Sequence, residues 1–211
     1  MTAHSPLAEA VIDGDWGAAA ELAKSAIQAG EDPRQIIHQQ LQPAMGEVGE
    51  RFSSGEYFLP DMLAAGRAMT NALEILKPLL GDTTAATAGK ILIGTVQGDV
   101  HDIGKNMVSM FLKGTGFEVV DLGIDVAAER FVDEVRKQQP DLLGLSALLT
   151  TTMPYLGTVI KALEEAGVRS LVKVVVGGAP VTQGYADLIG ADAYANDAGE
   201  AAGTCKRLVG V

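Results

Sequence analysis

The sequence predicts an α/β protein in two parts, a bundle of four helices followed by a doubly wound sheet of five parallel strands. Apolar residues recur at helical spacing as far as about residue 80, whereas β-rich apolar runs alternate with helical patterns after Lys90. Between these parts, residues 81–89 (GDTTAATAG) are small and polar, as in a linker. We therefore expect a bundle domain at 1–80, a linker at 81–89 and a sheet domain at 90–211.

Helix start signals divide the first part. A short apolar segment at 6–13 comes first, and Asp15 can then cap a helix over 16–29. Asp32-Pro33 starts the third helix and Pro60 opens the fourth, since proline favours the first turn. Short loops between such helices are typical of a small bundle. The apolar positions expected to point inward in the last two helices are Ile36, Ile37, Leu41, Met45, Val48 and Phe52, then Leu63, Met69, Leu73 and Leu76.

The second part reads as repeated strand–helix units. Its strands are continuous apolar runs, which indicates burial on both faces and hence a parallel, Rossmann-like or flavodoxin-like sheet. Ligands of such sheets bind outside the carboxyl ends of the strands, so the loops there should converge. The expected strands are 90–96, 117–123, 141–147, 172–178 and 191–195, and the expected helices are 102–113, 127–138, 152–166, 181–189 and 198–208.

Composition excludes several classes of protein. The chain has 211 residues, 47% of them hydrophobic, and a net charge of −11, which argues against binding to nucleic acid or to an anionic membrane surface. Cys205 is the one cysteine, so neither a disulfide framework nor a cysteine-based zinc site is expected. The stretch MTAHSPLAEAV does not resemble a secretory signal, and no apolar run approaches the ~18 residues of a membrane span. We expect a cytoplasmic protein.

The stretch GDVHDIGKN, residues 98–106, follows the first strand and places His101 between two aspartates. Asp99 and Asp102 could be ordinary turn or helix-capping residues, and a lone loop histidine is usually a surface residue. However, imidazole is a good ligand for transition metals, and such a ligand normally donates its other N–H to a carboxylate. Asp99 is two residues from His101, so both side chains can leave the same side of an extended segment. The sequence thus indicates a metal ligand with its orienting carboxylate.

Further protein ligands for a metal are missing near this loop. His4 and His38 lie in the first part of the chain, and no cysteine is near. A single protein ligand implies a metal that brings its own equatorial ring, as in haem or a corrin. A small glycine-rich loop at a sheet edge does not resemble a haem pocket, which usually has large aromatic and apolar walls.

Three motifs together resemble a known family. Asp99–Gly104 (DVHDIG), Ser146–Leu148 (SAL) and Gly177-Gly178 resemble the D-x-H-x-x-G…S-x-L…G-G signature of base-off, His-on cobalamin-binding domains. Residues 49–62 (GERFSSGEYFLPDM) resemble the end of the helical cap in the methionine synthase type. The resemblance covers nearly the whole chain, and the length is similar to that of free-standing corrinoid proteins of three-component methyltransferase systems.

The resemblance implies roles for individual residues. His101 would be the lower axial cobalt ligand, Asp99 would hydrogen-bond it, and Thr152 would continue this relay. Cobalamin or a related corrinoid, with methylcobalamin as the loaded form, would be the cofactor. The remaining implied cofactor contacts are Gly98, Val100, Asp102, Ile103 and Gly104 in the loop, Ser146, Leu148, Thr150, Gly177, Gly178 and Ala198 around the nucleotide tail, and Phe52, Leu59 and Met62 over the upper corrin face.

The function implied by the resemblance is that of a methyl carrier without turnover of its own. Expected partners are a substrate-specific methyltransferase, a second methyltransferase that passes the methyl group to tetrahydrofolate or a thiol, and a reductive activase. A sensory cobalamin-binding module with a separate output protein is the alternative, although the acidic charge disfavours DNA-binding regulators. A mutase subunit is a third reading, disfavoured because such subunits normally lack the helical cap that FLPDM indicates. The methyl donor is left open.

Overall fold

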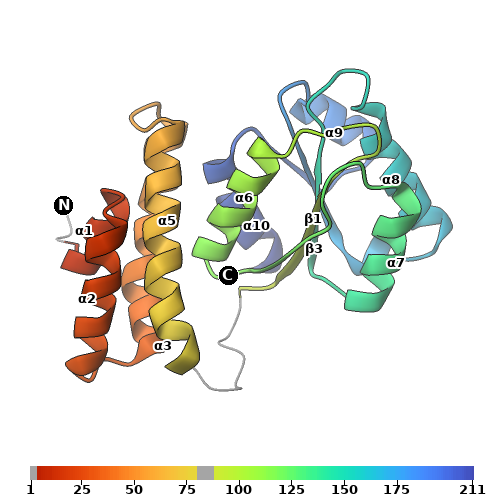
Figure 1. Ribbon diagram of the computed structural model, residues 1–211. Helices are drawn as coiled ribbons and strands as arrows, with labels where there is room; N and C mark the ends of the chain where they lie inside the picture. Colours follow the sequence, from red (N-terminus) through yellow and green to blue (C-terminus); the bar gives the residue numbers. More distant parts are fainter. Residues whose placement is uncertain (1–3, 80–87) are drawn as a thin grey trace. The chain divides into compact units, whose positions relative to one another are not determined.

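The computed structural model describes residues 4–79 and 88–211, which fall into two compact units (Figure 1). The helical unit is formed mainly by residues up to 87 and the sheet unit by residues from 88 onward. Most of the expected linker, residues 81–87, lies outside the described residues. No helix among the described residues is long and apolar enough to cross a membrane.

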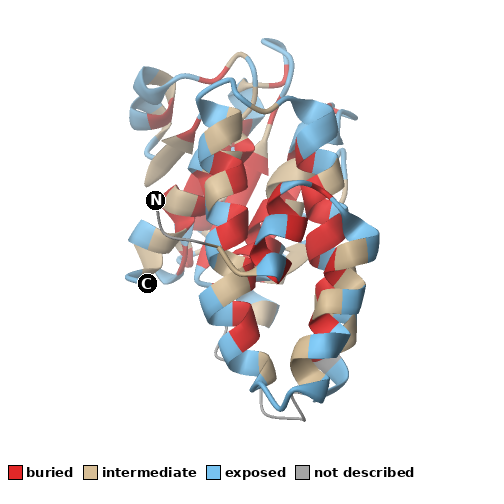
Figure 2. Cartoon of the chain, turned by 90° about the vertical axis from the view of Figure 1, so that its left-hand side faces the viewer, coloured by how far each residue is buried: buried red, intermediate tan, exposed pale blue. Residues whose placement is uncertain are grey.

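Residues 4–79 of the first unit form four rod-like helical segments, as the start signals predict. The Asp15 carboxylate accepts a hydrogen bond from the Ala18 amide at 2.9 Å, and Asp32 caps the helix that begins with Pro33. Buried residues gather on the sides of the helices that face one another (Figure 2). The helices are α1 (Pro6–Ile12), α2 (Trp16–Gln28), α3 (Pro33–Ile36) with a π-helical segment (Ile37–Leu41) and α4 (Gln42–Ser53) in one rod, α5 (Leu59–Leu76), and a 3₁₀ turn (Lys77–Leu79).

The π-helical segment within the third rod has a local cause. Pro43 has no N–H to donate to the carbonyl of residue 39, and its ring would clash with that carbonyl in a regular α-helix. The hydrogen-bond ladder widens over Ile37–Leu41, immediately before the proline. The apolar stripe still points inward, since Ile36, Leu41 and Met45 are fully buried.

The expectation that Leu63 points inward is wrong, because this side chain is 49% exposed. Met69 and Leu76 are buried as expected. Helix α5 packs against α2, and the residues that these helices bury are mostly small, including Ala19 and Ala23 of α2. Alanines therefore form much of this packed face, and Leu63 lies off it.

The sheet unit confirms the doubly wound prediction (Figure 1). All pairs of neighbouring strands are parallel, in the order β2-β1-β3-β4-β5, which has its switch point beside β1. The strands are β1 (Lys90–Thr95), β2 (Glu118–Asp121), β3 (Leu142–Ser146), β4 (Lys173–Gly177) and β5 (Ala193–Ala195). The helices are α6 (Ile103–Gly114), α7 (Ala128–Gln138), α8 (Pro154–Glu165), a 3₁₀ turn (Arg169–Leu171), α9 (Gln183–Ile189) and α10 (Ala198–Val209).

Both faces of the sheet are covered. Leu92 and Leu143 belong to the core that α7, α8 and α9 close, whereas Ile91 and Leu142 belong to the core that α6 and α10 close. Cys205 lies in the second core and is 1% exposed, as a small packing residue should be. Successive residues of one strand thus enter opposite cores, which explains the unbroken apolar runs in the sequence.

The strand register brings the predicted loops together. Thr95 pairs with Ser146, and Ser146 pairs with Gly177, so β1, β3 and β4 end level with one another. The loops after these strands therefore start at the same edge, as expected. This carboxyl edge is where the candidate site forms.

At the β4–β5 border, the Asp192 carboxylate joins three groups and supplies a stability prediction. It accepts hydrogen bonds from Arg169 at 2.7 Å, Lys173 at 3.0 Å and the Val174 amide at 2.8 Å. Burial by itself would raise the pKa of Asp192, but these donors lower it below the ordinary 3.8. Asp192→Asn should therefore reduce the free energy of unfolding at pH 7 by about 1–3 kcal/mol.

The pH dependence of the Asp192 effect has a definite sign. Because the folded pKa is lowered, the carboxylate stabilises the fold fully above the unfolded value and loses this contribution as pH falls through the folded one. The difference between wild type and Asp192→Asn should shrink below about pH 4 in urea unfolding. Asp187→Asn is the control, since Asp187 is exposed and bonded to the Gln183 side chain. Equal pH profiles for the two variants would contradict the assignment.

Candidate functional site

His101 and Asp99 form a hydrogen-bonded pair in the loop between β1 and α6. The Asp99 Oδ1 atom lies 2.7 Å from His101 Nδ1 and also accepts from the His101 amide at 3.0 Å. The Thr95 hydroxyl donates to the His101 carbonyl at 3.0 Å, which ties the loop to the end of β1. The side chains leave the loop on the same side, as their two-residue spacing predicts.

Asp99 is completely buried, and donors surround its carboxylate. Its Oδ2 atom accepts from the Leu148 amide at 2.7 Å and from the Thr152 hydroxyl at 2.6 Å. Burial by itself would raise the pKa of Asp99, but the bonds from Thr152, Leu148 and His101 outweigh it and hold the pKa far below its ordinary value. The carboxylate is therefore ionised and acts only as an acceptor.

The Thr152 hydroxyl has a second acceptor within reach. Its Oγ1 lies 3.0 Å from the Leu149 carbonyl as well as 2.6 Å from Asp99. The single hydroxyl proton can serve either partner, one at a time. The three residues of the predicted relay, His101, Asp99 and Thr152, are thus contiguous.

The geometry fixes which nitrogen of His101 is available. Because the ionised Asp99 only accepts, Nδ1 carries a proton, and Nε2 is the ring nitrogen left to bind a metal. The His101 side chain is 46% exposed, and within residues 4–79 and 88–211 no group hydrogen-bonds Nε2. An imidazole whose Nδ1 is held by a carboxylate is the arrangement of many metal-ligating histidines.

The donor set fits a metal that arrives in its own ring. Among the described residues, no group of three or more His, Cys, Asp and Glu side chains is arranged to hold a metal ion. His101 would therefore be the one protein ligand, as the sequence indicates. A cofactor that supplies the other ligands of its own metal would fit this donor set, and His101 Nε2 would hold it.

Several exposed apolar side chains lie at the carboxyl edge that carries His101, and we call them the apolar rim. Val100 and Ile103 are 65% and 69% exposed, although both are large hydrophobic residues. The rim consists of Val100, Ile103, Ile124, Leu148 and Leu149, all of which are exposed. Ile103 is the first residue of α6, and the others lie in the loops after β1, β2 and β3. A cluster of this kind is typical of a binding surface, here for a flat apolar ligand.

Two rim residues were not predicted from the sequence. Ile124 and Leu149 are each 41% exposed and follow the carboxyl ends of β2 and β3. They could have been found from the sequence as apolar residues in loops at the ligand-binding edge of a parallel sheet. Read singly, such residues are unremarkable, because isolated surface leucines and isoleucines are common.

Asp102 lies at the start of α6 without the side-chain cap that we considered. The Asp102 carbonyl accepts from the Asn106 amide at 2.7 Å, as an N-cap residue does. Among the described residues, its carboxylate accepts from the Asn106 side-chain amide at 3.0 Å. Gly104 is exposed, and a side chain there would enter open space, so the fold itself does not require a glycine. Their contacts with a cofactor stay predictions.

The glycine pair at the end of β4 is required by the protein's own backbone. A Cβ atom on Gly178 would lie 1.9 Å from the Ala147 carbonyl oxygen, and Gly178 has a φ of +127°. A Cβ atom on Gly177 would lie 3.0 Å from the Ala195 carbonyl oxygen. The pair is thus explained without a ligand, and its predicted role beside a nucleotide tail remains a prediction, as does that of half-buried Ser146 and exposed Thr150.

Substitution of Gly178 should destabilise the fold. Gly178→Ala is expected to cost about 2–4 kcal/mol of unfolding free energy, because the methyl group collides with backbone and the φ angle is unfavourable for alanine. Gly184→Ala is a matched control, since a Cβ atom on Gly184, in α9, meets nothing within 4 Å. Urea unfolding of the two apoproteins measures the difference. Equal stabilities would show that the two loops separate easily.

The remaining predicted contacts have mixed accessibility. In the helical unit, Phe52 is half-buried, Leu59 is 39% exposed and Met62 is fully buried in the described structure. Ala198 is buried as the first residue of α10. Burial of Met62 agrees with packing in the bundle, and a role of these side chains against a cofactor stays a prediction.

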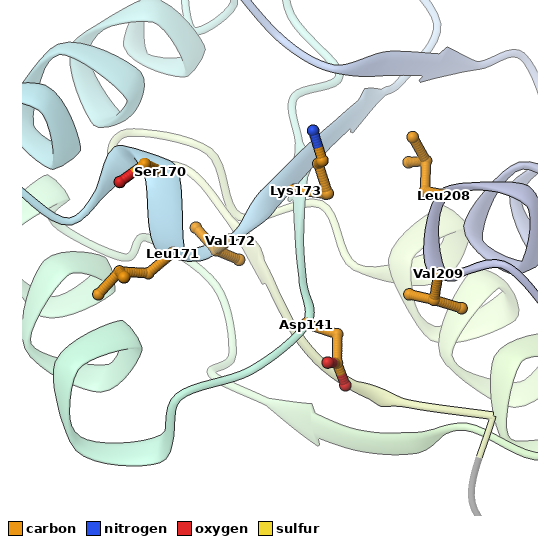
Figure 3. Close-up of a pocket in the computed structure, with 7 residues that line it drawn as sticks. All are labelled: Asp141, Ser170, Leu171, Val172, Lys173, Leu208 and Val209. Atoms are coloured by element: carbon orange, nitrogen blue, oxygen red, sulfur yellow. The ribbon is translucent and has the colours of Figure 1, made fainter.

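A shallow hollow of about 240 Å³ lies at the other end of the strands (Figure 3). Asp141 precedes β3 and Lys173 begins β4, so the hollow opens at the amino edge, away from His101. The Lys173 ammonium is paired with Asp192 at 3.0 Å. The full lining is Asp141, Ser170, Leu171, Val172, Lys173, Leu208 and Val209, none of which belongs to the predicted site.

Comparison with known proteins agrees with this site. Models of the B12 binding domain match residues 89–209 and 4–77. Dimethylamine corrinoid protein 1 of Methanosarcina acetivorans is 48% identical over 91% of this chain and 89% of that protein. The trimethylamine corrinoid protein of Methanosarcina barkeri is 44% identical over 96% of this chain and 94% of that protein.

Solved structures with the same organisation are also similar. A cobalamin-binding protein from Desulfitobacterium hafniense has a TM-score of 0.82 and 37% identity, covering 96% of each chain. A chain of the methanol:cobalamin methyltransferase complex of Methanosarcina barkeri has a TM-score of 0.85 and 34% identity, covering 97% of this chain and 78% of that one. These matches span the helical part, the sheet and the His101 loop. The chain therefore belongs to the B12-binding corrinoid proteins, the family that its sequence motifs resemble.

Proposed function

We propose that this protein is the methyl carrier of a multi-component methyltransferase system. It would hold a corrinoid in the base-off, His-on state, receive a methyl group from a substrate-specific methyltransferase and deliver it to a second methyltransferase. The proposal rests on one observation above all: buried Asp99 holds Nδ1 of a half-exposed His101, and Nε2 has no hydrogen-bond partner among the described residues. Family membership supports the same reading, since the similar curated proteins are named corrinoid proteins.

The residues of the relay have separate tasks. When bound, the corrinoid supplies a cobalt centre that accepts a methyl group and gives it up again. His101 would hold the metal through Nε2, and Asp99 would keep the proton on Nδ1 so that the ring stays neutral and correctly turned. The fixed negative charge of Asp99 would lie beside the ring whether or not Nε2 holds the metal, because bonds from Leu148 and Thr152 hold that carboxylate independently of His101. Thr152 adjusts by turning its hydroxyl toward Asp99 or toward Leu149.

The apolar rim would exclude water from the lower face of the cofactor. Val100 and Ile103 flank His101, and Leu148 follows β3 at the same edge. Covering these side chains with a flat ring removes apolar area from water, which favours binding by about 25 cal/mol per Å². Removal of water also strengthens the interaction between His101 and Asp99, because the local dielectric constant falls.

The relatives favour a methylamine as the source of the methyl group. The curated relatives that are 44–48% identical are named dimethylamine and trimethylamine corrinoid proteins. The chain from the methanol:cobalamin methyltransferase complex is less similar, at 34% identity. We therefore propose a methylamine methyltransferase as the first partner, with a thiol or tetrahydrofolate methyltransferase as the second and a reductive activase that keeps the cobalt competent.

A visible spectrum tests the proposed function. The apoprotein is incubated with hydroxocobalamin, desalted, strongly reduced and then given a methyl donor such as methyl iodide. Retained corrinoid that shows nitrogen ligation and cycles between reduced and methylated spectra is the expected result. Loss of all corrinoid on desalting, also after unfolding and refolding with the cofactor, would refute the carrier function. Methylation by mono-, di- or trimethylamine with purified partner methyltransferases then identifies the donor.

A further inference from the structure

The loop after β2 continues the pairing with β1 beyond the end of the sheet. The Thr95 amide donates to the Gly123 carbonyl at 3.0 Å, and the Val126 amide donates to the Thr95 carbonyl at 3.0 Å. One step further, the Asp125 amide donates to the Asp99 carbonyl at 3.0 Å. This loop therefore reaches the main chain of the residue whose side chain orients His101.

Asp125 holds the His101 loop at two points. Besides its amide bond to Asp99, its carboxylate accepts from the Gly98 amide at 2.7 Å. Gly98 and Asp99 are consecutive. Asp125 therefore holds the N–H group at the start of this dipeptide and the C=O group at its end. Asp125 adopts a φ of +51°, a left-handed conformation that is uncommon for a residue other than glycine. Aspartate and asparagine tolerate this conformation better than most residues.

We propose that Asp125 is a positioning residue for the axial histidine. The Asp99 carboxylate is fixed by Leu148 and Thr152 from the loop after β3, whereas the Asp99 main chain is fixed by Asp125 from the loop after β2. Both ends of Asp99 must be held for its Oδ1 to stay 2.7 Å from His101 Nδ1. Loss of the Asp125 grip should let the Asp99–His101 pair rotate away from the metal position. The inference rests on the proposed function.

Three variants separate the carboxylate from the backbone conformation. Asp125→Asn keeps an acceptor oxygen and tolerates the left-handed φ. Asp125→Gly keeps the conformation easily accessible but removes the acceptor, and Asp125→Ala loses both. Comparing Asp125→Asn with Asp125→Gly tests the acceptor oxygen, and comparing Asp125→Gly with Asp125→Ala tests the backbone conformation.

The measurements are made on full-length protein loaded with hydroxocobalamin. The affinity for this corrinoid and, after reduction to Co(II), the nitrogen-ligated fraction seen by electron paramagnetic resonance are both recorded. Because one hydrogen bond is lost, Asp125→Gly and Asp125→Ala should bind hydroxocobalamin about threefold to tenfold more weakly and show more unligated cobalt. Asp125→Asn should stay within about twofold of wild type. Thermal unfolding of each apoprotein checks that the variants fold.

Other outcomes overturn the inference. Wild-type behaviour of all three variants would show that Asp125 positions nothing. A defect in Asp125→Ala alone would assign the effect to backbone conformation, and equal defects in all three would exclude the acceptor. If the wild-type chain itself retains no nitrogen-ligated corrinoid, the proposed function fails, and this inference fails with it. If the wild-type chain binds corrinoid with nitrogen ligation and the three variants do the same, only the inference about Asp125 fails and the proposed function stands.

Discussion

His101→Ala should abolish nitrogen ligation of the bound cobalt while the apoprotein remains folded. The His101 side chain is 46% exposed, but its removal takes the Nδ1–H donor away from the buried Asp99 carboxylate, so the free energy of unfolding should fall by about 1–3 kcal/mol. Loss of an orienting neighbour typically weakens a metal site 10–100-fold, so loss of the ligand itself should weaken corrinoid binding on the order of 100-fold or more. Some corrinoid should remain, held by the apolar rim.

His38→Ala is the matched control for this experiment. His38 is also exposed, but it lies in the helical unit and contacts Gln42 at 3.1 Å. Visible spectra after loading with hydroxocobalamin, together with equilibrium binding, compare the two variants with wild type. A His101→Ala protein with full occupancy and the wild-type spectrum would remove His101 from the metal. The ligand would then have to be sought elsewhere, since the described residues offer no ready-made cluster.

Much of the fold could be predicted because the sheet is buried on both faces. The run from Ile91 to Val96 is entirely buried, so it appears in the sequence as an uninterrupted apolar segment. The proximity of Asp99 and His101 was also predictable, because spacing along an extended segment is a local property. Leu63 was misplaced because helical periodicity favours large residues, whereas α2 and α5 bury mainly small ones.

The contribution of the loop after β2 depends on tertiary structure. Ile124 and Asp125 reach the site because β2 pairs with β1 in a register that aligns Asp121 with Ile93. A shift of this register would move both residues away from Gly98 and Asp99. Nothing local in the sequence fixes this register or the positive φ of Asp125. Residues that hold a site from a neighbouring strand are therefore harder to predict than those in its motif.

Asp99→Asn should impair the site more than any other conservative change in the His101 loop. Each carboxylate oxygen of Asp99 faces two donors: His101 N and Nδ1 on one side, Leu148 N and the Thr152 hydroxyl on the other. Asparagine has one acceptor oxygen and one NH₂ group, so one side must meet donors with a donor. Such a buried mismatch should cost about 1–3 kcal/mol of stability.

The two orientations of the new amide would harm the site differently. If its NH₂ group faces His101, the ring is driven to carry its proton on Nε2, which removes the lone pair needed by the metal. If the NH₂ group faces Leu148 and Thr152 instead, the hydrogen bond from the Leu148 amide is lost. Thr152 can still donate its hydroxyl proton to the Leu149 carbonyl and accept a hydrogen bond from the new NH₂ group. In both cases the corrinoid affinity should fall roughly 10–100-fold, and the cobalt reduction potential should shift.

Asp102→Asn is the control that isolates position from charge. Asp102 is three residues along the same loop and equally acidic, but its side chain is exposed and bonded to Asn106. Redox titration should therefore leave Asp102→Asn close to wild type, whereas Asp99→Asn changes the potential. Corrinoid affinity is compared only between wild type and Asp99→Asn, because Asp102 is itself a predicted cofactor contact. Identical titrations for wild type and Asp99→Asn would reduce Asp99 to a turn residue. Equal shifts in both variants would mean that the loop's negative charge, and not the bond to His101 Nδ1, tunes the metal.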